Sequence, residues 1–389
     1  MAMKRLKILF LSMLLLVPAA QAQQLQLRLD STAYAAVLTC GPGNDFYTTF
    51  GHSAIRICDS ASGLDVVYNY GTFDFNTSNF YWKFACGNLK YCLSRTSFSH
   101  FMEEYIYEGR AVCQQRLRLS NQELNNLFVA LETNYLPQFR FYTYDFLRDN
   151  CATRVRDMVN NSLAHRQLFV PCEVADAKSY RDLLRDATGR NLMWWQVGID
   201  MLLGMRCDTK CNNLQYMFSP IEMMRQLDST HVVGTNECLA EPVEQLLEES
   251  RPQLSPSVSP LWVFWALLAA VVALTILARV YRFGITWFDV ILFSVVFLAS
   301  ALMLFLWLAS SHYCTKINFN VLWASPLFLY FAIRPNRSPK WLIVAQIVLI
   351  FVAILMTIVA WPQQLPTVVI PISLILIVRL ADKLINRNI

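Results

Sequence analysis

The chain has 389 residues, of which 55% are hydrophobic and only 16% are charged, and its formal net charge is +5. A soluble globular protein of this length carries fewer apolar residues, so the composition excludes a fully soluble chain. The positive charge is accounted for by short loops between apolar segments and indicates no nucleic-acid partner.

The first 22 residues have the pattern of a secretory signal peptide. Basic residues lie near the start, an apolar run covers residues 8–17, and residues 20–22 form a small-x-small cleavage site. We expect cleavage before Gln23. No cysteine follows the cut, so this signal does not make the chain a lipoprotein. An uncleaved membrane anchor is the alternative.

Residues 23–240 are expected to form one exported domain with a substantial core. The predicted strands are Ala35–Thr39, Ser53–Cys58, Val66–Tyr70 and Arg110–Leu119. The turn sequence at residues 59–63 joins the second and third strands in a hairpin. A capping box at residues 120–123 predicts a helix to about residue 134.

A second helix is predicted to begin at Cys151 and to run towards Asn161. In the run Asp149-Asn150-Cys151-Ala152-Thr153-Arg154, an Asp or Asn directly before the cysteine is typical of a helix cap. The thiol then lies on the first helical turn, where the helix dipole and free N–H groups stabilise a thiolate. Arg154 adds positive charge one turn on. We therefore predict that Cys151 is a nucleophile, with a structural cysteine as the alternative.

His52 is the predicted general base. It lies in the run Phe50-Gly51-His52-Ser53 and opens a strand, where its side chain can face a cleft. The other histidines of the exported region lie in a Ser/Phe-rich segment or in polar helix and loop contexts: His100, His165 and His231. A cysteine at a helix start and a histidine on a strand are the pair that papain-like thiol enzymes use, here with the histidine first.

A third side chain should hold the imidazole of His52 in place. The hairpin puts His52 opposite residues near 70, which makes Asn69 and Tyr70 candidates, with Asp74 a little further along. We predict Asn69 for this role. The alternative is that this asparagine is an incidental amide on the face of the sheet.

Residues 241–260 are interpreted as a linker and residues 261–389 as a transmembrane domain. Apolar stretches predict about five spanning helices, at 261–279, 285–309, 318–333, 341–361 and 366–380. Three segments rich in Lys and Arg alternate with two loops, around His312 and Gln363, that are nearly free of positive charge. The positive-inside rule places the basic segments and the C-terminus in the cytoplasm. We expect a multi-pass protein of a bacterial inner membrane with its exported domain in the periplasm.

All eleven cysteines lie on the exported side of this topology, where disulfides are permitted. Two pairs are close enough in sequence to bond, Cys207 with Cys211 and Cys86 with Cys92, although sequence does not determine the connectivity. Zinc is the weaker interpretation, because there is no CxxC pair and the histidines do not cluster with cysteines at ligand spacing. We expect no metal and no cofactor.

Several motifs of the exported domain carry a resemblance to a known family. They are LTCGPG at 38–43, FGHSAIR at 50–56, YNYGTFDF at 68–75, EGR at 108–110, and YDF with DNCATR within 144–154. These motifs resemble the Bacteroides-type lipoprotein N-acyltransferase family of Bacteroidota, and the membrane region looks similar too. The order of His and Cys also resembles the permuted papain-like group that includes lecithin:retinol acyltransferase.

The resemblance implies an α+β exported domain of permuted papain-like type, followed by an all-α five-helix transmembrane domain. It implies that Cys151 takes an acyl chain from a phospholipid as a thioester. The chain then passes to the N-terminal amine of a diacylated lipoprotein, with His52 as base. The third catalytic member differs between these groups, so Asn69 stays open. The implied partners are a phospholipid donor, a lipoprotein acceptor and the lipid bilayer, and His312 could contact a headgroup or the site.

Two other functions fit the same residues. A membrane-anchored thiol peptidase or cell-wall amidase would use the same Cys and His, but it would not need five spans. A non-enzymatic membrane protein that binds lipoproteins would instead have Cys151 in a disulfide and a replaceable His52. A single reactive exported cysteine at position 151 would favour an enzyme.

Overall fold

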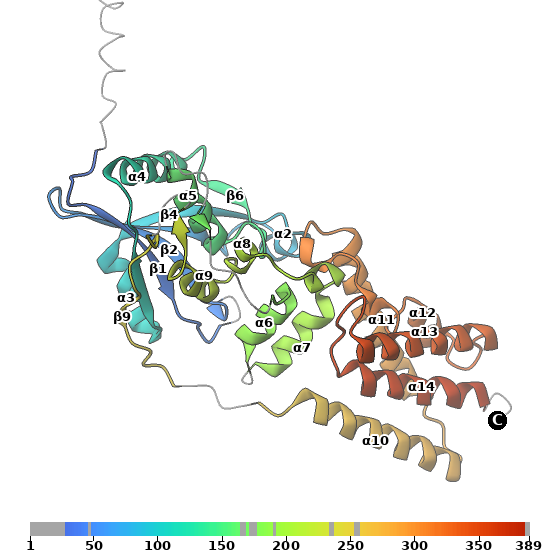
Figure 1. Ribbon diagram of the computed structural model, residues 1–389. Coiled ribbons are helices and arrows are strands. Elements are labelled where there is room, and N and C mark those ends of the chain that lie inside the picture. Colours follow the sequence, from blue (N-terminus) through green and yellow to red (C-terminus); the bar gives the residue numbers. More distant parts are fainter. Residues whose placement is uncertain are drawn as a thin grey trace, which may run out of the picture.

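The computed structural model describes residues 28–45, 48–163, 169–170, 177–189, 192–232, 237–252 and 257–385. The predicted signal peptide, His165 and Cys172 lie outside the described residues. Figure 1 shows a domain built on a β-sheet, a group of shorter helices beside it, and a bundle of long helices that extends away from both.

A seven-stranded antiparallel sheet forms the centre of the exported domain, with the order β6-β4-β3-β2-β1-β5-β9. Its strands are β1 (Tyr34–Cys40), β2 (His52–Asp59), β3 (Leu64–Thr72), β4 (Lys90–Ser97), β5 (Val112–Arg116), β6 (Phe141–Thr143) and β9 (Glu244–Leu247). A separate pair joins β7 (Phe169–Val170) to β8 (His231–Val232). The predicted hairpin is confirmed, since β2 and β3 pair with Ile55 opposite Tyr68.

Helices cover both faces of the sheet (Figure 1). On one face lie α4 (Asn121–Tyr135) and α5 (Cys151–Ser162), which share an apolar core with the side chains of Ile55, Ile57 and Tyr68. On the other face, α3 (Phe98–Glu108) packs on alternate residues of the same strands. Residues next to each other in a strand point to opposite faces, so each strand serves two cores. The capping box that opens α4 is present as predicted.

Three strands of the central sheet were not predicted from the sequence. β4 and β6 lie at one end of the sheet, and both are polar or short, so their hydrophobic patterns are weak. β9 lies in residues 241–260, which the sequence indicated as a linker, and it pairs with β5 at the other end of the sheet. The short helix α2 (Phe80–Cys86) precedes β4 and has no buried residue.

Between the sheet and the long helices lies a group of short helical elements. They are α6 (Tyr180–Thr188), α7 (Met193–Leu202), η2 (Met205–Asp208), α8 (Asn213–Tyr216) and α9 (Pro220–Leu227). We call residues 180–189 and 192–208 the docking segment, because this part contacts the membrane helices. Its α7 packs on the first of them, where the ring of Trp194 lies 6.0 Å from that of Phe264.

The C-terminal region is helical, as predicted. Its helices are α10 (Pro260–Val280), α11 (Thr286–Leu308), α12 (Leu327–Ile333), α13 (Lys340–Val359) and α14 (Val369–Ile385). Among the described residues, α10, α11 and α13 are long and apolar enough to cross a membrane. The other two helices are shorter than that, so the structure does not establish five crossings.

The span expected at residues 318–333 is not one continuous helix. Only α12 is α-helical there, and its seven residues extend about 10 Å, well short of a bilayer core of about 30 Å. The preceding backbone is irregular, and the buried amides of Asn318, Asn320 and Gln363 bond to it and to neighbouring loops. Irregular backbone is tolerated at this depth where protein groups satisfy it.

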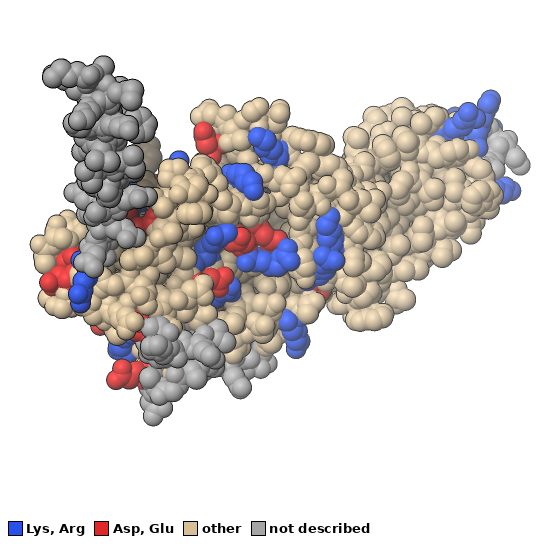
Figure 2. Space-filling model, turned by 90° about the horizontal axis from the view of Figure 1, so that it is seen from above, with Lys and Arg blue, Asp and Glu red and all other residues tan. Residues whose placement is uncertain are grey.

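The basic ends of the long helices gather at one end of the bundle. Arg279 of α10 pairs with Asp382 of α14 at 2.8 Å, and Arg379 pairs with Asp289 of α11 at 2.7 Å. On the face seen in Figure 2, charged side chains mark the exported domain and the far end of the bundle, with an uncharged band between them. The opposite end of the bundle faces the exported domain (Figure 1).

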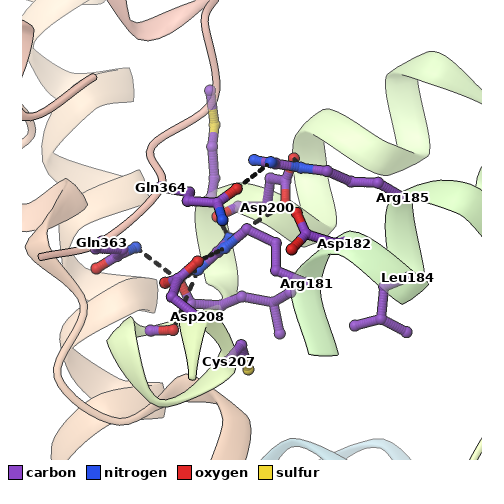
Figure 3. A network of polar contacts seen from close by, with 12 residues as sticks. Arg181, Asp182, Leu184, Arg185, Asp200, Cys207, Asp208, Gln363 and Gln364 are labelled. Atoms are coloured by element: carbon purple, nitrogen blue, oxygen red, sulfur yellow. Dashed lines mark hydrogen bonds and ion pairs between the residues drawn. The ribbon is translucent and has the colours of Figure 1, made fainter. Parts of the chain in front are cut away.

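A buried arginine organises the docking segment. The Arg181 guanidinium is fully buried; it pairs with Asp208 at 2.6 Å and with Asp200 at 3.1 Å (Figure 3). Its remaining donors bond to the carbonyl oxygens of Leu203 and Gly204, each at 3.1 Å. A buried charge needs this many partners to offset its lost hydration.

The same network reaches the membrane domain. Arg185 donates to Gln364 at 2.7 Å, and Gln363 donates to the carbonyl of Leu203 at 2.9 Å, so the loop before α14 is bonded to the docking segment (Figure 3). The N–H of Gly204 donates to the carbonyl of Cys314 at 2.8 Å. A Cβ at Gly204 would lie only 2.0 Å from the carbonyl oxygen of Lys316, so no side chain fits there.

None of the ten described cysteines is in a disulfide. The two pairs considered from the sequence, Cys207 with Cys211 and Cys86 with Cys92, are therefore not bonded, and Cys207 has a partner elsewhere in the chain. The Sγ of Cys207 lies 3.3 Å from the carbonyl oxygen of Cys314, and the thiols of Cys207 and Cys314 also interact. This contact adds a further tie between the docking segment and the loop after α11.

We expect Arg181→Ala to lower the free energy of unfolding by about 3–5 kcal/mol, because it leaves the buried carboxylate of Asp208 without its ion-pair partner and leaves Asp200 with Arg185 alone. Chemical unfolding of the purified protein in detergent measures this change. Arg225→Ala is the matched control, since Arg225 is 66% exposed and its ion pair is with Glu222 of the same helix. That variant should lose less than about 1 kcal/mol. Equal losses would contradict the importance assigned to Arg181.

Candidate active site

Cys151 is the first residue of α5, as the cap sequence predicts. The side-chain oxygen of Asn150 accepts from the N–H of Thr153 at 2.9 Å, and the Thr153 hydroxyl accepts from the N–H of Asn150 at 2.8 Å. The amide of Asn150 also donates to the carbonyls of Phe146 and Phe218, both at 2.8 Å. These bonds fix the start of the helix. The Cys151 side chain is 7% exposed.

The Cys151 thiol is surrounded by groups that favour its ionised form. Burial alone raises the pKa of Cys151. This effect is outweighed by the nearby His52, both by its charge and by a hydrogen bond, and by the backbone N–H groups of Ser53 and Ala152. The net direction is a lowered pKa. These are the conditions under which a cysteine becomes a nucleophile.

His52 is the first residue of β2, and its imidazole lies between Cys151 and Asn69. Its Nε2 donates to the side-chain oxygen of Asn69, which leaves Nδ1 as the nitrogen that faces the thiol. Burial lowers the pKa of His52. The interactions with Cys151 and the bond to Asn69 raise it by more than burial lowers it, so the net direction is upward. The two shifts favour a thiolate–imidazolium pair.

The other two candidates for holding His52 have different partners. The hydroxyl of Tyr70 is buried and donates to Asn134 of α4 at 2.7 Å. The carboxylate of Asp74 accepts from the N–H of Asn76 at 2.8 Å in an exposed turn. The structure therefore brings Cys151, His52 and Asn69 together, and their catalytic roles stay a prediction.

The side chain of Arg154, one turn along α5 from Cys151, makes its contacts with other groups. Its guanidinium pairs with Asp149 at 2.8 Å and covers the ring of Tyr142 at 3.9 Å. The interactions that do most to lower the pKa of Cys151 are with His52 and two backbone N–H groups. The guanidinium of Arg154 is therefore held between Asp149 and the ring of Tyr142.

Gly71 is part of the site, although sequence reasoning missed it. The register between β3 and β4 shifts between Asn69 and Thr72, and Gly71 within this shift has a φ of +91°. A Cβ at Gly71 would lie 3.6 Å from the Cβ of Cys151 and 3.9 Å from His52. A larger side chain would enter the space beside the thiol. An isolated glycine inside a strand pattern is the signal that could have found it.

The remaining histidines lie elsewhere. His100 is exposed and pairs with Glu103 at 3.1 Å, and His231 is in β8. His312 donates from Nε2 to the carbonyl of Phe84 on α2 at 2.8 Å, so it joins α2 to the loop after α11. Across the described parts of the chain, no group of three or more potential ligands is placed to hold a metal ion.

The fold and site define a class: a membrane-anchored protein whose antiparallel sheet domain holds a buried Cys–His pair. Residues 20–185 match the Lnb N-terminal periplasmic domain, and residues 252–388 match the Lnb transmembrane domain. The chain belongs to the Lnb lipoprotein N-acyltransferase family, as the sequence motifs indicated. No curated protein and no solved structure shows a significant match.

We expect His52→Ala to slow alkylation of Cys151 by iodoacetamide at pH 7 by tenfold or more. Without the imidazolium, burial dominates and the pKa of Cys151 rises, and each unit of pKa reduces the thiolate about tenfold. Asn69→Ala should act in the same direction, because it removes a bond that raises the pKa of His52.

The alkylation rate is measured by mass spectrometry of the peptide that contains Cys151, between pH 5 and 10. The wild-type rate should already be high below the ordinary thiol pKa. His100→Ala is the control and should leave the rate unchanged. Equal rates in wild type and His52→Ala would refute the ion pair.

Proposed function

We propose that the protein is a lipoprotein N-acyltransferase. It moves an acyl chain from a phospholipid through a thioester on Cys151 to the N-terminal amine of a diacylated lipoprotein. The observation that carries the proposal is the Cys151–His52–Asn69 arrangement in a periplasmic domain of this family, docked on membrane helices. A phospholipid and the lipid anchor of a lipoprotein are both confined to the bilayer, so both substrates are available to a membrane-anchored thiol.

In the first step the Cys151 thiolate attacks the ester carbonyl carbon of the phospholipid. A sulfur–carbon bond forms, the ester carbon–oxygen bond breaks, and the departing oxygen takes the proton of the His52 imidazolium. The products are an acyl-thioester and a lysophospholipid. The N–H groups of Ser53 and Ala152, which bond to the sulfur before reaction, lie beside the carbonyl oxygen as negative charge develops on it.

In the second step a neutral amine attacks the thioester. A nitrogen–carbon bond forms, the sulfur–carbon bond breaks, and His52, now neutral, accepts the amine proton. This restores the thiolate–imidazolium pair, so the enzyme returns to its starting state. Asn69 acts as a positioning residue, because it bonds to Nε2 and keeps Nδ1 directed at the sulfur.

We propose, together with this function, a fold type, a signal peptide and a membrane topology for the chain. The exported domain is of permuted papain-like type, residues 1–22 are a cleaved signal peptide, and the C-terminal region crosses the inner membrane five times with a cytoplasmic C-terminus. The gathering of the basic segments at the end of the bundle opposite the exported domain supports this orientation. The proposed boundaries are 23–240 for the domain, 241–260 for the linker and 261–389 for the membrane region.

We expect a two-step mass change in the purified protein. With phospholipid alone, intact-mass analysis should show the gain of one acyl chain at Cys151 and the release of lysophospholipid. Adding a diacylated lipopeptide with a free N-terminal amine should remove the acyl chain and yield an N-acylated peptide. The second step should speed up as pH rises towards the amine pKa of about 8, because only the neutral amine attacks.

Cys151→Ser should abolish the acyl gain, whereas Cys113→Ser, a matched change in the same domain away from the site, should not. If the acyl chain never appears on the protein, covalent catalysis is refuted. If it appears but leaves only to water, a lipase or peptidase-like hydrolase is supported instead. If Cys151 is unreactive in the native membrane, the chain is a lipoprotein-binding protein.

The proposed orientation predicts that a reporter active only in the cytoplasm will work when fused after Ile389. The same reporter inserted in the loop at Ser311, on the exported side, is the control and should be silent. If the C-terminal fusion is well expressed but inactive, the C-terminus is on the exported side. The chain would then cross the membrane an even number of times after the exported domain.

A further inference from the structure

Helix α2 (Phe80–Cys86) places aromatic side chains on the surface of the exported domain. None of its residues is buried; Tyr81 is 80% exposed, Trp82 is 63% exposed, and Phe84 is 46% exposed. Lys83 is its one charged residue. A patch of large aromatic residues on a short helix marks an interaction site, because exposing this much apolar surface to water is unfavourable.

The position of α2 identifies the interaction as one with the membrane. The ring of Trp82 lies 5.4 Å from that of Phe305, which is in the last turn of the spanning helix α11. The N–H of Ser311 donates to the carbonyl of Cys86 at 2.7 Å, and His312 donates to the carbonyl of Phe84. A Cβ at Gly87 would lie 3.1 Å from the backbone of His312.

These bonds fix α2 at the exported end of α11 (Figure 1). That level is the boundary between the hydrocarbon core and the headgroups, where tryptophan and tyrosine are favoured because one end of the ring system is apolar and the other polar. A protein partner would find the same residues, but the direct contact of Trp82 with a spanning helix favours lipid.

A continuous series of aromatic contacts connects α2 to the reactive thiol. The ring of Phe80 contacts that of Phe73 at 5.8 Å, Phe73 contacts Tyr91 at 5.2 Å, and Tyr91 stacks on Tyr144 at 4.3 Å. Tyr144 and the side chain of Cys151 both border the space at Gly71, where a Cβ would lie 3.8 Å and 3.6 Å from them. We call Phe73, Phe80, Tyr91 and Tyr144 the aromatic row.

We propose that α2 lies in the outer leaflet of the membrane and that the aromatic row binds the acyl chain of the donor phospholipid and directs its ester to Cys151. The proposal rests on the acyltransferase function above. The ligand is a phospholipid of the bilayer, bound through its hydrocarbon chain. The glycine at position 71 leaves the space that the ester carbonyl needs beside the thiol.

The test compares two acyl donors on the same purified protein in phosphatidylethanolamine proteoliposomes. One donor is the bilayer lipid, read as acyl-Cys151 by intact mass. The other is water-soluble p-nitrophenyl butyrate, read as a burst of p-nitrophenol when the thiolate displaces it and the butyryl group remains on sulfur. The soluble ester arrives from water, so its reaction does not require α2 to lie in the leaflet.

We expect Tyr81→Asp to slow acylation from the bilayer at least tenfold and to change the rate with the soluble ester less than twofold. A carboxylate at the hydrocarbon boundary keeps α2 out of the leaflet. Tyr81→Phe should retain bilayer acylation. Tyr107→Asp is the matched control, because Tyr107 is 93% exposed on α3, away from the membrane helices, and it should leave both rates unchanged.

If Tyr81→Asp acylates normally from the bilayer, α2 is not the entry site and a protein partner becomes its occupant. If Tyr81→Asp loses the reaction with both donors, Tyr81 is needed for the structure of the site around Cys151, and the proposal is overturned. Failure of the proposed thioester step is seen separately, because the wild type itself would then show no acyl chain from the bilayer lipid.

Discussion

The contact between Cys151 and His52 is the constraint on which the rest of the exported domain depends. Both side chains are largely buried, and burial alone opposes a charge on either of them. The charged pair therefore exists only while the two groups remain within hydrogen-bond distance. Because they are about a hundred residues apart in sequence, the register of β2 and the cap of α5 must both be held firmly.

Much of this site could be predicted from sequence because its determinants are local. The cap at Asn150 places Cys151 on the first turn of α5, and a short turn fixes which residues of β3 lie beside His52. This register puts residue 71 opposite His52, and Asn69 lies two residues along on the same face of the strand. The contact between Arg154 and Tyr142 could not be predicted, since Tyr142 belongs to a strand that forms only through tertiary contacts.

The parts that sequence reasoning missed depend on long-range contacts. β9 is a short polar strand that exists because β5 offers an open edge 130 residues earlier in the chain. The segment before α12 looked like a continuous span because it is apolar, but Pro326 and the buried amides of Asn318 and Asn320 break the helix. Hydropathy measures transfer to lipid and does not register groups that bond to protein within the bundle.

The docking of the exported domain has a consequence for the order of biosynthesis. Two of the bonds of the docking segment, from Arg185 to Gln364 and from Gln363 to the carbonyl of Leu203, need residues that leave the ribosome more than 150 residues later. The sheet, the cap and the Cys–His pair are complete long before these residues are made. The exported domain can therefore be folded, with its thiol in place and its contacts to α11 and the following loop available, before Gln363 and Gln364 have been made. The nascent protein thus passes through a stage in which the Cys–His pair is assembled but the bonds from the loop before α14 are still missing.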